Sequence, residues 1–569
     1  MLTKFGIGNF KAFGKLQEIP LKPITLIYGA NSAGKSSILH SLVFSHEANL
    51  NGDLDVHHTS IGGDSVDLGG FRQFIHRRNT DANLSWFAEL DTSKMNGRLA
   101  ELLSKVKTVR LSLEIGIAKN EVELKVPYMD KTTGELHISM TREMEEIGTP
   151  QVRTYSISGD GVDIFNFSKR ADGTLKLDRI NTDHSAFREL LNAFLAYSSS
   201  TESFSEEDYE SVSEIVGDVI SKIKIKRGTL LPLGVERGKQ ENIASTFIPI
   251  SKGNRRGDLQ SAVRMFLPRI IDELVEGVAS TFSEELNTLT YLGPLRSLPD
   301  RHFAFSKHSD PNWKSGGGYA WDVVQRDGAV RDRVNIWLNS KDRLQTPYLL
   351  NVNQLFTIDD LDQEYANQIE QIENKFISEM NDPTVGTEDG EPQMDLFGEI
   401  YEVLTNIEKN KTVSSDLHEL ALVDLRTGTS VSHRDVGVGI SQVLPVLVTA
   451  YASVQEIIAI EQPEIHLHPA LQADLGDVFI DSALMNGNRF LLESHSEHLL
   501  LRIMSRMRET YEDKLPHGMP KVTPDDVCVL FVDTVDNKSV VREMPLNERG
   551  ELLHPWPGGF FEEDFDELF

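Results

Sequence analysis

Residues 29–36 read G-A-N-S-A-G-K-S, which is two glycines separated by four residues and followed by Lys and Ser. This spacing is the pattern of a phosphate-binding loop. An apolar run at residues 24–27 precedes the loop and an apolar-spaced segment at residues 37–43 follows it, which predicts a buried strand and a helix. A turn between strand and helix directs backbone N–H groups and the positive helix end at one point, where a triphosphate fits. We therefore expect this loop to bind ATP through Asn31, Ser32, Ala33, Gly34, Lys35, Ser36 and Ser37.

The overall charge limits the choice of partners. The 569 residues include 87 acidic and 57 basic side chains, a formal net charge of −30. This argues against nonspecific nucleic-acid binding over the whole surface, because such binding needs a basic footprint. Two basic stretches, residues 76–78 and 252–256, leave a local basic groove open, although a solvated loop explains each more simply.

The sequence also indicates a cellular location. No apolar run is long enough to cross a bilayer, and the N-terminal residues lack the long apolar segment of a signal peptide. Cys528 is the only cysteine, which excludes an intramolecular disulfide and a multi-cysteine zinc site. We expect a cytoplasmic protein without a membrane partner, and a buried, unreactive thiol at Cys528 because it lies in an apolar strand.

The middle of the chain alternates between strand and helix patterns. Mixed apolar and polar segments predict an antiparallel meander with strands at residues 84–90, 108–118, 121–128, 136–141, 153–159 and 174–178. Helical patterns follow at residues 186–197, 206–222 and 260–286, and a strand and turn at residues 291–296.

A longer helix is predicted at residues 358–380. Thr357 and Asp360 form a variant of the capping box, and Asn381-Asp382-Pro383 ends the helix. A polar loop at residues 383–394 and a second helix at residues 396–409 follow. The pair is either a helical insertion packed on the core or an arm for dimerisation or partner docking.

A second cluster of polar residues lies near the C-terminal end. Residues 457–460, I-I-A-I, form a buried-strand pattern that ends at Glu461. An acidic residue at the tip of such a strand, beside a phosphate loop, binds the metal opposite Ser36. The surrounding segments are Q-P-E at residues 462–464, I-H-L-H-P at 465–469, F-L-L at 490–492, E-S-H-S at 493–496 and, before them all, D-V-G-V-G-I-S-Q at 435–442.

Four motifs follow one another along the chain: the phosphate loop, the glycine-serine-glutamine segment, the acidic strand and the S-H-S strand. Motifs in this order resemble those of an ABC-type ATPase of the SMC, RecF and OLD-like group. In bacteria this group includes the AAA-15/21-type ATPases. The segment W-P-G-G-F-F at residues 556–561 resembles a C-terminal module of some members. The resemblance implies an α/β fold, a P-loop NTPase of ABC type with an antiparallel β-subdomain and helical insertions. It also implies ATP and Mg²⁺ as cofactors. Residues 80–290 contribute little to this family resemblance.

The resemblance implies roles for single residues. Gly437, Gly439, Ser441 and Gln442 match the signature that closes over the γ-phosphate held by a second protomer. His495 matches the switch histidine that contacts the γ-phosphate. In the loop at residues 67–76, Gln73 and His76 are two candidates for a polar residue that contacts metal and water. The expected metal ligands are Ser36, Gln73 and Glu461.

One position departs from the family pattern. The residue after the metal carboxylate is usually Glu and acts as the base that positions water, but here it is Gln462, which cannot accept a proton. Either Glu464 replaces it through a water molecule or hydrolysis is slow. The expected catalytic set is Glu461, Gln462, Glu464 and His495. A zinc site at Glu464, His466 and His468 is a weaker alternative, because no further ligand is marked.

The chain is not expected to cut nucleic acid itself. Too few residues follow His495 for the nuclease domain of OLD-type relatives. Asp533 and Asp536, beside the strand at residues 527–532, are more simply the acidic residues of a β-hairpin.

Two functions remain. In the first, an ATPase sensor or regulator controls a separately encoded effector, such as a nuclease, in bacterial anti-phage defence. In the second, a RecF-like ATPase of DNA repair or chromosomes binds duplex DNA in its ATP-closed dimer. The acidic charge favours the first. In both, one phosphate loop and one signature per chain imply a homodimer or larger assembly that shares two ATP molecules.

The expected domains follow from these assignments. Their boundaries are 1–78 for the N-terminal part of the ATPase domain, 79–182 for the β meander, 183–290 for a helical insertion, 291–345 for the return to the ATPase core, 346–412 for the helical arm and loop, and 413–569 for the C-terminal part of the ATPase domain.

Overall fold

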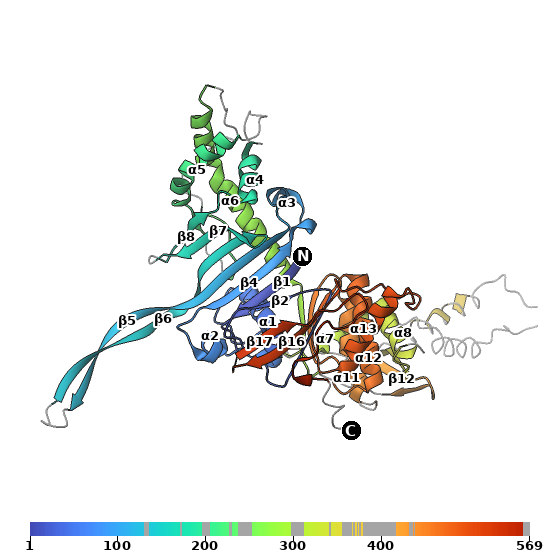
Figure 1. Ribbon diagram of the computed structural model, residues 1–569. Helices are drawn as coiled ribbons and strands as arrows, with labels where there is room; N and C mark the ends of the chain where they lie inside the picture. Colours follow the sequence, from blue (N-terminus) through green and yellow to red (C-terminus); the bar gives the residue numbers. More distant parts are fainter. Residues whose placement is uncertain are drawn as a thin grey trace, which may run out of the picture. The chain divides into compact units, whose positions relative to one another are not determined.

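Segments from both ends of the chain fold together (Figure 1). The computed structural model describes residues 1–129, 136–170, 173–195, 205–226, 230–236, 253–296, 312–340, 343–355, 417–431, 436, 438–536 and 538–561, with isolated residues between 367 and 378. The chain divides into a first unit of Met1–Ser297, Asp310–Gly318 and Pro445–Phe569, and a second unit of Leu298–Ser309 and Tyr319–Leu444.

A six-stranded sheet forms the centre of the first unit. Its order is β10 (Leu289–Leu292), β14 (Ile457–Glu461), β15 (Arg489–Glu493), β3 (Ile24–Gly29), β16 (Val527–Val535) and β17 (Lys538–Glu543). All neighbours are parallel except β16 and β17. Every residue of β3, β14 and β15 is buried, as expected for parallel strands covered on both faces.

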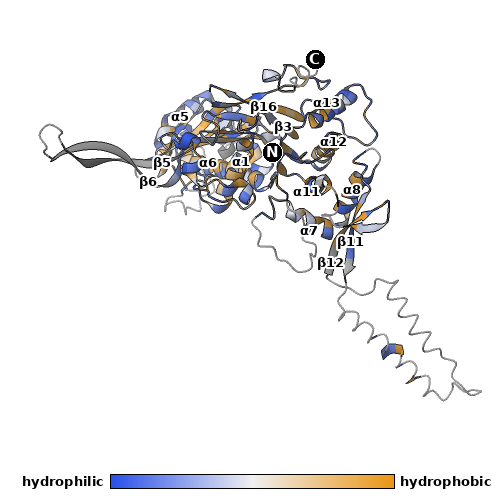
Figure 2. Cartoon of the chain, turned by 90° about the horizontal axis from the view of Figure 1, so that it is seen from below, coloured by the Kyte–Doolittle hydropathy of each residue, from blue (hydrophilic) through white to orange (hydrophobic). Residues whose placement is uncertain are grey.

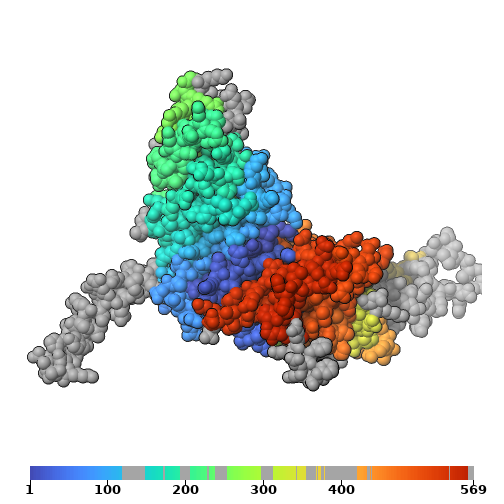
Figure 3. Space-filling view, viewed as in Figure 1, coloured from blue at the N-terminus to red at the C-terminus, as the bar shows by residue number. Residues whose placement is uncertain are grey.

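This sheet joins the two ends of the chain. Hydrophobic residues predominate along β3 and β16, which are direct neighbours (Figure 2). On the surface, the N-terminal residues in dark blue and the C-terminal residues in red lie side by side (Figure 3). The α/β fold predicted from the motifs is confirmed.

The helices of this layer flank the strands that carry the motifs. They are α1 (Lys35–Asn51), α11 (Val438–Ala452), α12 (Pro469–Asn486) and α13 (Glu497–Tyr511). Helix α12 packs against α13, where the buried carboxylate of Asp477 pairs with Arg502 and Arg506 at 2.9 and 2.7 Å. No helix among the described residues is long and apolar enough to cross a membrane.

An antiparallel sheet of eight strands completes the first unit. Its order is β2 (Gln17–Pro20), β1 (Leu2–Gly8), β4 (Leu84–Asp91), β5 (Thr108–Met129), β6 (Leu136–Gly159), β7 (Val162–Lys169), β8 (Leu175–Ile180) and β9 (Lys224–Ile225). The predicted meander is therefore confirmed, with two corrections. The predicted pairs of strands at 108–118 with 121–128 and at 136–141 with 153–159 are each one long strand, and β7 was missed.

The long strands cross polar positions that suggested turns. Strand β5 pairs with β4 only over residues 108–115, and β6 pairs with β7 only over residues 154–159. Beyond these limits β5 and β6 pair only with each other and leave the sheet as a two-stranded ribbon (Figure 1). Register shifts lie near Glu114 and Gly116, and from Ala118 to Met129 the pairing continues without interruption through the predicted break at residues 119–120.

Three helices pack together beside this sheet, at the predicted places: α4 (Ser185–Leu195), α5 (Glu206–Ile220) and α6 (Arg255–Asn287). Arg255 and Arg256, the last two residues of the basic stretch at 252–256, begin α6. Arg255 pairs with Asp208 at 2.8 Å and Arg256 with Glu214 at 2.5 Å, both on α5. These two cations therefore hold α6 to α5, which favours the structural explanation of this stretch over a nucleic-acid groove.

Short elements complete the first unit: α2 (Phe71–Phe74), α3 (Gly97–Leu102) and the 3-10 turns η1 (Asp64–Val66), η2 (His76–Arg78), η3 (Thr92–Lys94) and η4 (Pro557–Gly559). Asp536 lies in the turn between β16 and β17, and Asp533 pairs with Arg542 at 3.1 Å. The hairpin explanation of these two aspartates is confirmed.

The second unit is smaller. It contains α7 (Gly318–Arg326), α8 (Gly328–Asn339), the start of α11 and an antiparallel sheet of β11 (Tyr348–Leu355), β12 (Leu417–Asp424) and β13 (Thr429–Val431). The side chain of Asn335 on α8 bonds both backbone groups of Leu350, which fixes the helix on the sheet. The predicted helices at 358–380 and 396–409, with the loop between them, lie largely outside the described residues.

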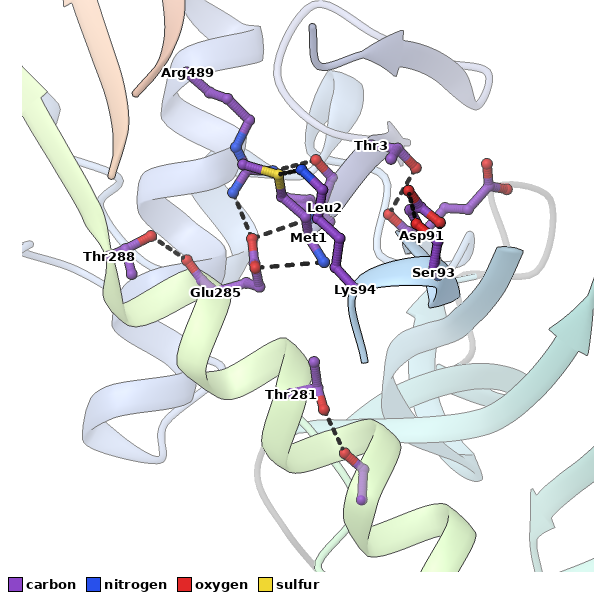
Figure 4. A network of polar contacts seen from close by, with 12 residues as sticks. Met1, Leu2, Thr3, Asp91, Ser93, Lys94, Thr281, Glu285, Thr288 and Arg489 are labelled. Carbon is purple, nitrogen blue, oxygen red and sulfur yellow. Dashed lines mark hydrogen bonds and ion pairs between the residues drawn. The ribbon is translucent and has the colours of Figure 1, made fainter. Parts of the chain in front are cut away.

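A buried polar network joins the two sheets of the first unit at the start of β15 (Figure 4). Arg489 donates to the carbonyl oxygen of Leu2 on β1 and pairs with Glu285 on α6. The backbone N–H of Leu2 donates to the same carboxylate at 2.9 Å. Arg489 and Glu285 border a cavity of about 530 Å³ whose wall includes Lys94 and Gln455.

We expect Cys528 to resist labelling by a thiol reagent in the native protein. Its side chain is buried in β16, and burial, followed by the negative charge of Glu543, raises the pKa of the thiol to about 12. The reactive thiolate is therefore scarce at neutral pH. Labelling should be slow in buffer and complete in denaturant. Fast labelling of the folded protein would contradict this prediction.

Candidate functional site

Three strands of the parallel sheet end at one edge and bring the motifs together. Glu461 at the end of β14 is the register partner of Glu493 at the end of β15, and Glu493 is the partner of Ile27, two residues before the phosphate loop. The carboxyl ends of parallel strands form the usual ligand-binding edge of an open α/β sheet. Residues far apart in the sequence therefore meet at this edge.

The phosphate loop needs its glycines. Gly29 and Gly34 have φ of 145° and 106°, a region that favours glycine. A Cβ at Gly29 would lie 2.3 Å from the carbonyl oxygen of Val532, and one at Gly34 would lie 2.6 Å from the Cβ of Ala12. The loop is thus confined between β16 and the loop that follows β1.

The side chains of the loop differ in exposure. Asn31 and Ser32 are exposed, whereas Ala33 and Ser37 are buried. Lys35 is buried, and its Nζ donates to the carbonyl oxygens of Gly29 and Ala30 at 3.0 Å each. Burial lowers the pKa of Lys35, while Glu493 and Glu464 act in the opposite direction. The lysine lies at the centre of the loop, where phosphates would be bound.

Glu493 is a site residue that the sequence prediction left out. The hydroxyl of Ser36 and the positive charge of Lys35 both lower the pKa of its carboxyl group. Burial, followed by the nearby negative charge of Glu461, raises the pKa of Glu493 to about 7. The sequence did contain a signal for Glu493, because two predicted apolar strands each end in Glu.

Glu461 is held from the protein side. Its Oε1 accepts a hydrogen bond from the Tyr291 hydroxyl at 2.8 Å and lies 3.1 Å from the His40 Nε2. Lys11 Nζ lies 2.6 Å from His40 Nδ1. Since Lys11 is the donor there, His40 carries its proton on Nε2 and donates it to Glu461.

The residues around Glu461 differ in how readily the sequence alone could identify them. His40 follows Ser36 by four positions and therefore shares its face of α1. Tyr291 becomes visible only once β10 is known to pair with β14. Burial lowers the pKa of Lys11 to about 8. This lysine lies in the loop that follows β1, and the sequence prediction did not include it.

The segment after β14 is fixed by a buried arginine. Arg296 donates to the carbonyl oxygens of Glu461 and Gln462 at 3.1 and 3.0 Å, and burial lowers its pKa to about 10. Gln462 has a φ of 45°, an uncommon value for a residue with a side chain. Such a conformation, held by surrounding bonds, is typical of functional sites.

Glu464 and His495 contact each other through the backbone. The N–H of His495 donates to Glu464 Oε1 at 2.7 Å, and burial raises the pKa of Glu464. The His495 side chain is half-buried, and its pKa is lowered by burial and by the charge of Lys35. At neutral pH the imidazole is therefore uncharged.

An aromatic cluster lies next to this segment. Tyr28, one residue before the phosphate loop, donates its hydroxyl to the carbonyl oxygen of Ser496 at 3.0 Å. The rings of Trp556 and Phe561 pack on Tyr28, with centroids 5.7 and 5.6 Å away. Phe560 packs on Phe531 of β16 at 5.2 Å. The C-terminal W-P-G-G-F-F segment thus covers the strand that leads into the phosphate loop.

Gln73 and His76, the two candidates for a residue that contacts metal and water, lie in different surroundings. Gln73 lies on the exposed side of the short helix α2, whereas His76 is half-buried. His76 Nδ1 lies 2.8 Å from the carbonyl oxygen of Lys11, so it donates to the loop that packs on Gly34. The geometry ties His76 to the site through the backbone of that loop.

The signature residues belong to the second unit. Gly439, Ser441 and Gln442 lie in the first turns of α11, where Ser441 is buried, and Gly437 lies outside the described residues. His466 and His468, the residues of the zinc alternative, are both exposed. His468 caps α12 by accepting the N–H of Ala470 at 3.3 Å.

The donor set of the site suits Mg²⁺ bound together with a nucleotide. The Oε2 atoms of Glu493 and Glu464 are buried and have no hydrogen-bond partner among the described residues. Within that part of the chain, no group of three or more His, Cys, Asp or Glu side chains could hold a metal alone. Mg²⁺ usually binds one or two carboxylates plus substrate phosphates, so a hydroxyl and carboxylates beside a phosphate loop fit it.

Comparisons with known proteins point to the same class. Residues 333–500 match a family model described as an AAA ATPase domain, and residues 522–569 match one described as a protein of unknown function, DUF3696. The sequence matches none of the curated proteins with which it was compared.

Solved structures of SMC heads show a loose likeness. The SMC head domain from Thermotoga maritima is 8% identical, with a TM-score of 0.31, 96% of this chain covered and 99% of that chain. The Smc head with an extended coiled coil from Pyrococcus furiosus, bound to the C-terminal domain of ScpA, is 9% identical with a TM-score of 0.33, covering 100% and 98%. Such low values transfer no residue or partner to this chain.

Proposed function

We propose that this chain, an ABC-type P-loop ATPase of the SMC- and RecF-like group, binds ATP and Mg²⁺ between two copies of itself and acts as a slow, nucleotide-gated regulator. The observation that supports ATP binding best is the phosphate loop with Lys35 buried at its centre, at the carboxyl edge of a parallel sheet. Its regulated partner would be a separately encoded effector, such as a nuclease, in bacterial anti-phage defence.

Each side chain has a role in this proposal. Lys35 would leave the carbonyl oxygens of Gly29 and Ala30 and contact the outer phosphates. Ser36 and Glu461 would hold Mg²⁺, which would supply positive charge beside the phosphates. The neutral imidazole of His495 would lie near the γ-phosphate, and Gln462 would orient a water molecule without accepting its proton.

The glutamine explains why we propose a switch. A base that takes a proton from water contributes a large factor to hydrolysis, and an amide at that position removes it. Glu464, the substitute considered from the sequence, accepts the His495 N–H with one oxygen, and burial raises its pKa. An ATP-bound state with a long lifetime is the expected consequence.

Two chains would complete each nucleotide site. One chain has one phosphate loop, in the first unit, and one signature with Gly439 and Ser441, in the second unit. A two-fold arrangement would place the signature of one chain over the ATP of the other. ATP would then strengthen dimerisation, and dimerisation would strengthen ATP binding by the same factor.

This shared site is tested by mixing two inactive variants. We expect Lys35→Ala and Ser441→Arg chains each to lose ATP trapping, and their mixture to recover part of it, because one intact composite site remains in each mixed dimer. The measurement is retention of labelled ATP after rapid gel filtration. Two copies of the same variant serve as the control. A mixture of folded chains that stays as inactive as its components would refute a shared site.

The partner needs a separate test. Products of the neighbouring genes are purified singly and added to the tagged wild-type chain or to Lys35→Ala, with and without ATP. Binding of a nuclease-like product that depends on ATP and is lost in the variant supports regulation of an effector. No nucleotide-dependent binding of any neighbouring product would count against it.

A RecF-like role in DNA binding is the second candidate, because Arg77 and Arg78 are exposed close to the site. Binding through phosphates weakens steeply with salt. Duplex DNA that binds only with ATP, weakens with salt and is lost in an Arg77→Ala, Arg78→Ala double variant would favour this role over effector control.

A further inference from the structure

We infer that Tyr291 and His40 are positioning residues for the magnesium site, because together they hold one oxygen of Glu461 and leave its other oxygen to the cation. This inference rests on the proposed binding of ATP and Mg²⁺, in which Ser36 and Glu461 hold the metal. It names the residues that orient this carboxylate. Neither Tyr291 nor His40 was among the site residues expected from the sequence.

The surroundings of Glu461 require partners for its side chain. Glu461 is only 8% exposed at the end of β14, and its register partner at the end of β15 is a second carboxylate, Glu493. The two charges repel each other, and the charge of Glu461 helps to raise the pKa of Glu493. A buried carboxylate in such a place needs compensating hydrogen bonds. Among the described residues, Tyr291 and His40 supply them to its side chain.

Both hydrogen bonds end on the same oxygen atom. The Tyr291 hydroxyl donates to Glu461 Oε1 at 2.8 Å, and His40 Nε2 donates to it at 3.1 Å. No residue in the part of the chain that the structure describes donates to Glu461 Oε2. The two bonds therefore fix the rotation of the carboxylate and leave Oε2 able to bind a cation.

The two donors come from different elements of the fold. Tyr291 on β10 is in register with Ala459, two residues before Glu461, so it lies on the same face of the sheet as Glu461. His40 follows Ser36 by four positions and lies on the same face of α1. The rings of His40 and Tyr291 pack edge to face, with centroids 6.5 Å apart. The bond from His40 therefore fixes the carboxylate relative to the Ser36 hydroxyl, the other expected metal ligand.

Each donor is held in turn. Lys11 Nζ lies 2.6 Å from His40 Nδ1, so the ring hydrogen is on Nε2, where it reaches Glu461. Tyr291 is buried, and the segment that begins with it ends in Arg296, which donates to the backbone carbonyl oxygen of Glu461 at 3.1 Å. This segment thus holds both the backbone and the side chain of Glu461. Hydrogen-bond partners of a metal ligand fix its orientation, and their loss weakens metal binding.

The experiment compares Tyr291→Phe with Tyr155→Phe in the full chain. Each change removes one hydroxyl from a buried tyrosine, and that of Tyr155, on β6, donates to the carbonyl oxygen of Leu230 at 3.0 Å. Mn²⁺ replaces Mg²⁺, and its affinity is measured from the electron paramagnetic resonance signal of free Mn²⁺ with a saturating non-hydrolysable ATP analogue. We expect Tyr291→Phe to weaken Mn²⁺ binding about tenfold and Tyr155→Phe to change it less than about twofold. Binding of the analogue in EDTA should remain within about twofold in both variants, since it involves no metal.

A double variant tests whether Tyr291 acts through Glu461. Glu461→Ala alone should weaken Mn²⁺ binding at least as much as Tyr291→Phe. Adding Tyr291→Phe to Glu461→Ala should then weaken it by less than about twofold more, because the group that Tyr291 orients is gone. A loss that adds in full would mean that Tyr291 acts elsewhere, and it would overturn the inference.

His40 has its own pair of variants. His40→Leu removes the donor and should weaken Mn²⁺ binding, whereas the amide of His40→Gln can donate from the position of Nε2 and should restore most of the affinity. If Tyr291→Phe fails to fold, as judged by thermal unfolding, this pair decides. Equal losses in both His40 variants, or no loss in His40→Leu, would overturn the inference.

The remaining outcomes separate the inference from the proposed function. A wild-type chain that binds the analogue and Mn²⁺, together with a folded Tyr291→Phe variant of unchanged Mn²⁺ affinity, would overturn the inference alone. A wild-type chain that binds no ATP analogue would remove the proposed function, and the inference with it.

Discussion

Replacing Lys35 with Ala should lower the affinity for ATP at least about tenfold, a loss of about 1.4 kcal/mol. Lys35 is buried at the centre of the phosphate loop, and among the described residues its ammonium group is bonded only to carbonyl oxygens of that loop. Phosphate oxygens are stronger acceptors for an ammonium group than backbone carbonyls, because they carry charge. Titration calorimetry with ATP and Mg²⁺ measures the loss directly.

The control for Lys35→Ala is Lys222→Ala. Lys222 is exposed at the end of α5 and pairs with Asp218 on the surface, so its removal changes the charge by the same amount without reaching the site. ATP binding that is equal in both variants and in the wild type would refute the assignment of the phosphate loop.

Replacing Gln462 with Glu should raise the steady-state rate of ATP hydrolysis about tenfold or more. The substitution keeps the length of the side chain and supplies a group that can accept a proton from water. The backbone of Gln462 is fixed by Arg296 and by a bond from its own N–H to the Glu493 carbonyl oxygen at 2.8 Å. Release of phosphate measures the rate, and the lifetime of the ATP-bound dimer should shorten in parallel.

The Gln462→Ala variant tests whether faster hydrolysis comes from the added carboxylate base or from the loss of the amide group. It removes the glutamine without adding a carboxylate, so it should not accelerate hydrolysis. If Gln462→Glu folds and binds ATP yet hydrolyses no faster than the wild type, the slow step is not the missing base at this position.

The fold was predictable where single segments carry strong patterns. The phosphate loop, the buried strands and the antiparallel meander follow from spacing and periodicity, and the structure confirms them. The long ribbon of β5 and β6 did not follow, because the polar residues near residue 120 look like a turn when only local sequence is considered. Pairing over 20 register positions decides otherwise.

The candidate site was predictable in part, for a physical reason. Glu461, Lys35 and His495 each belong to a local motif, and their roles remain predictions. Tyr291 and Lys11 join the site only through pairing between distant strands or loops, which one sequence does not reveal. Glu493, at the end of an apolar strand, and His40, four positions after Ser36, carried a signal in the sequence that the prediction did not use.

The position of β3 has a consequence for synthesis of the chain. This strand leaves the ribosome early, but its two neighbours, β15 and β16, are made only near the end. Lys22, just before β3, bonds to the carbonyl oxygen of Pro524 across 502 positions, and Tyr28 bonds to Ser496 across 468. Contacts this distant in sequence form slowly, and the nascent apolar strand is exposed until they do. A ribosome that stops before β16 therefore releases a chain whose phosphate loop has not yet been assembled.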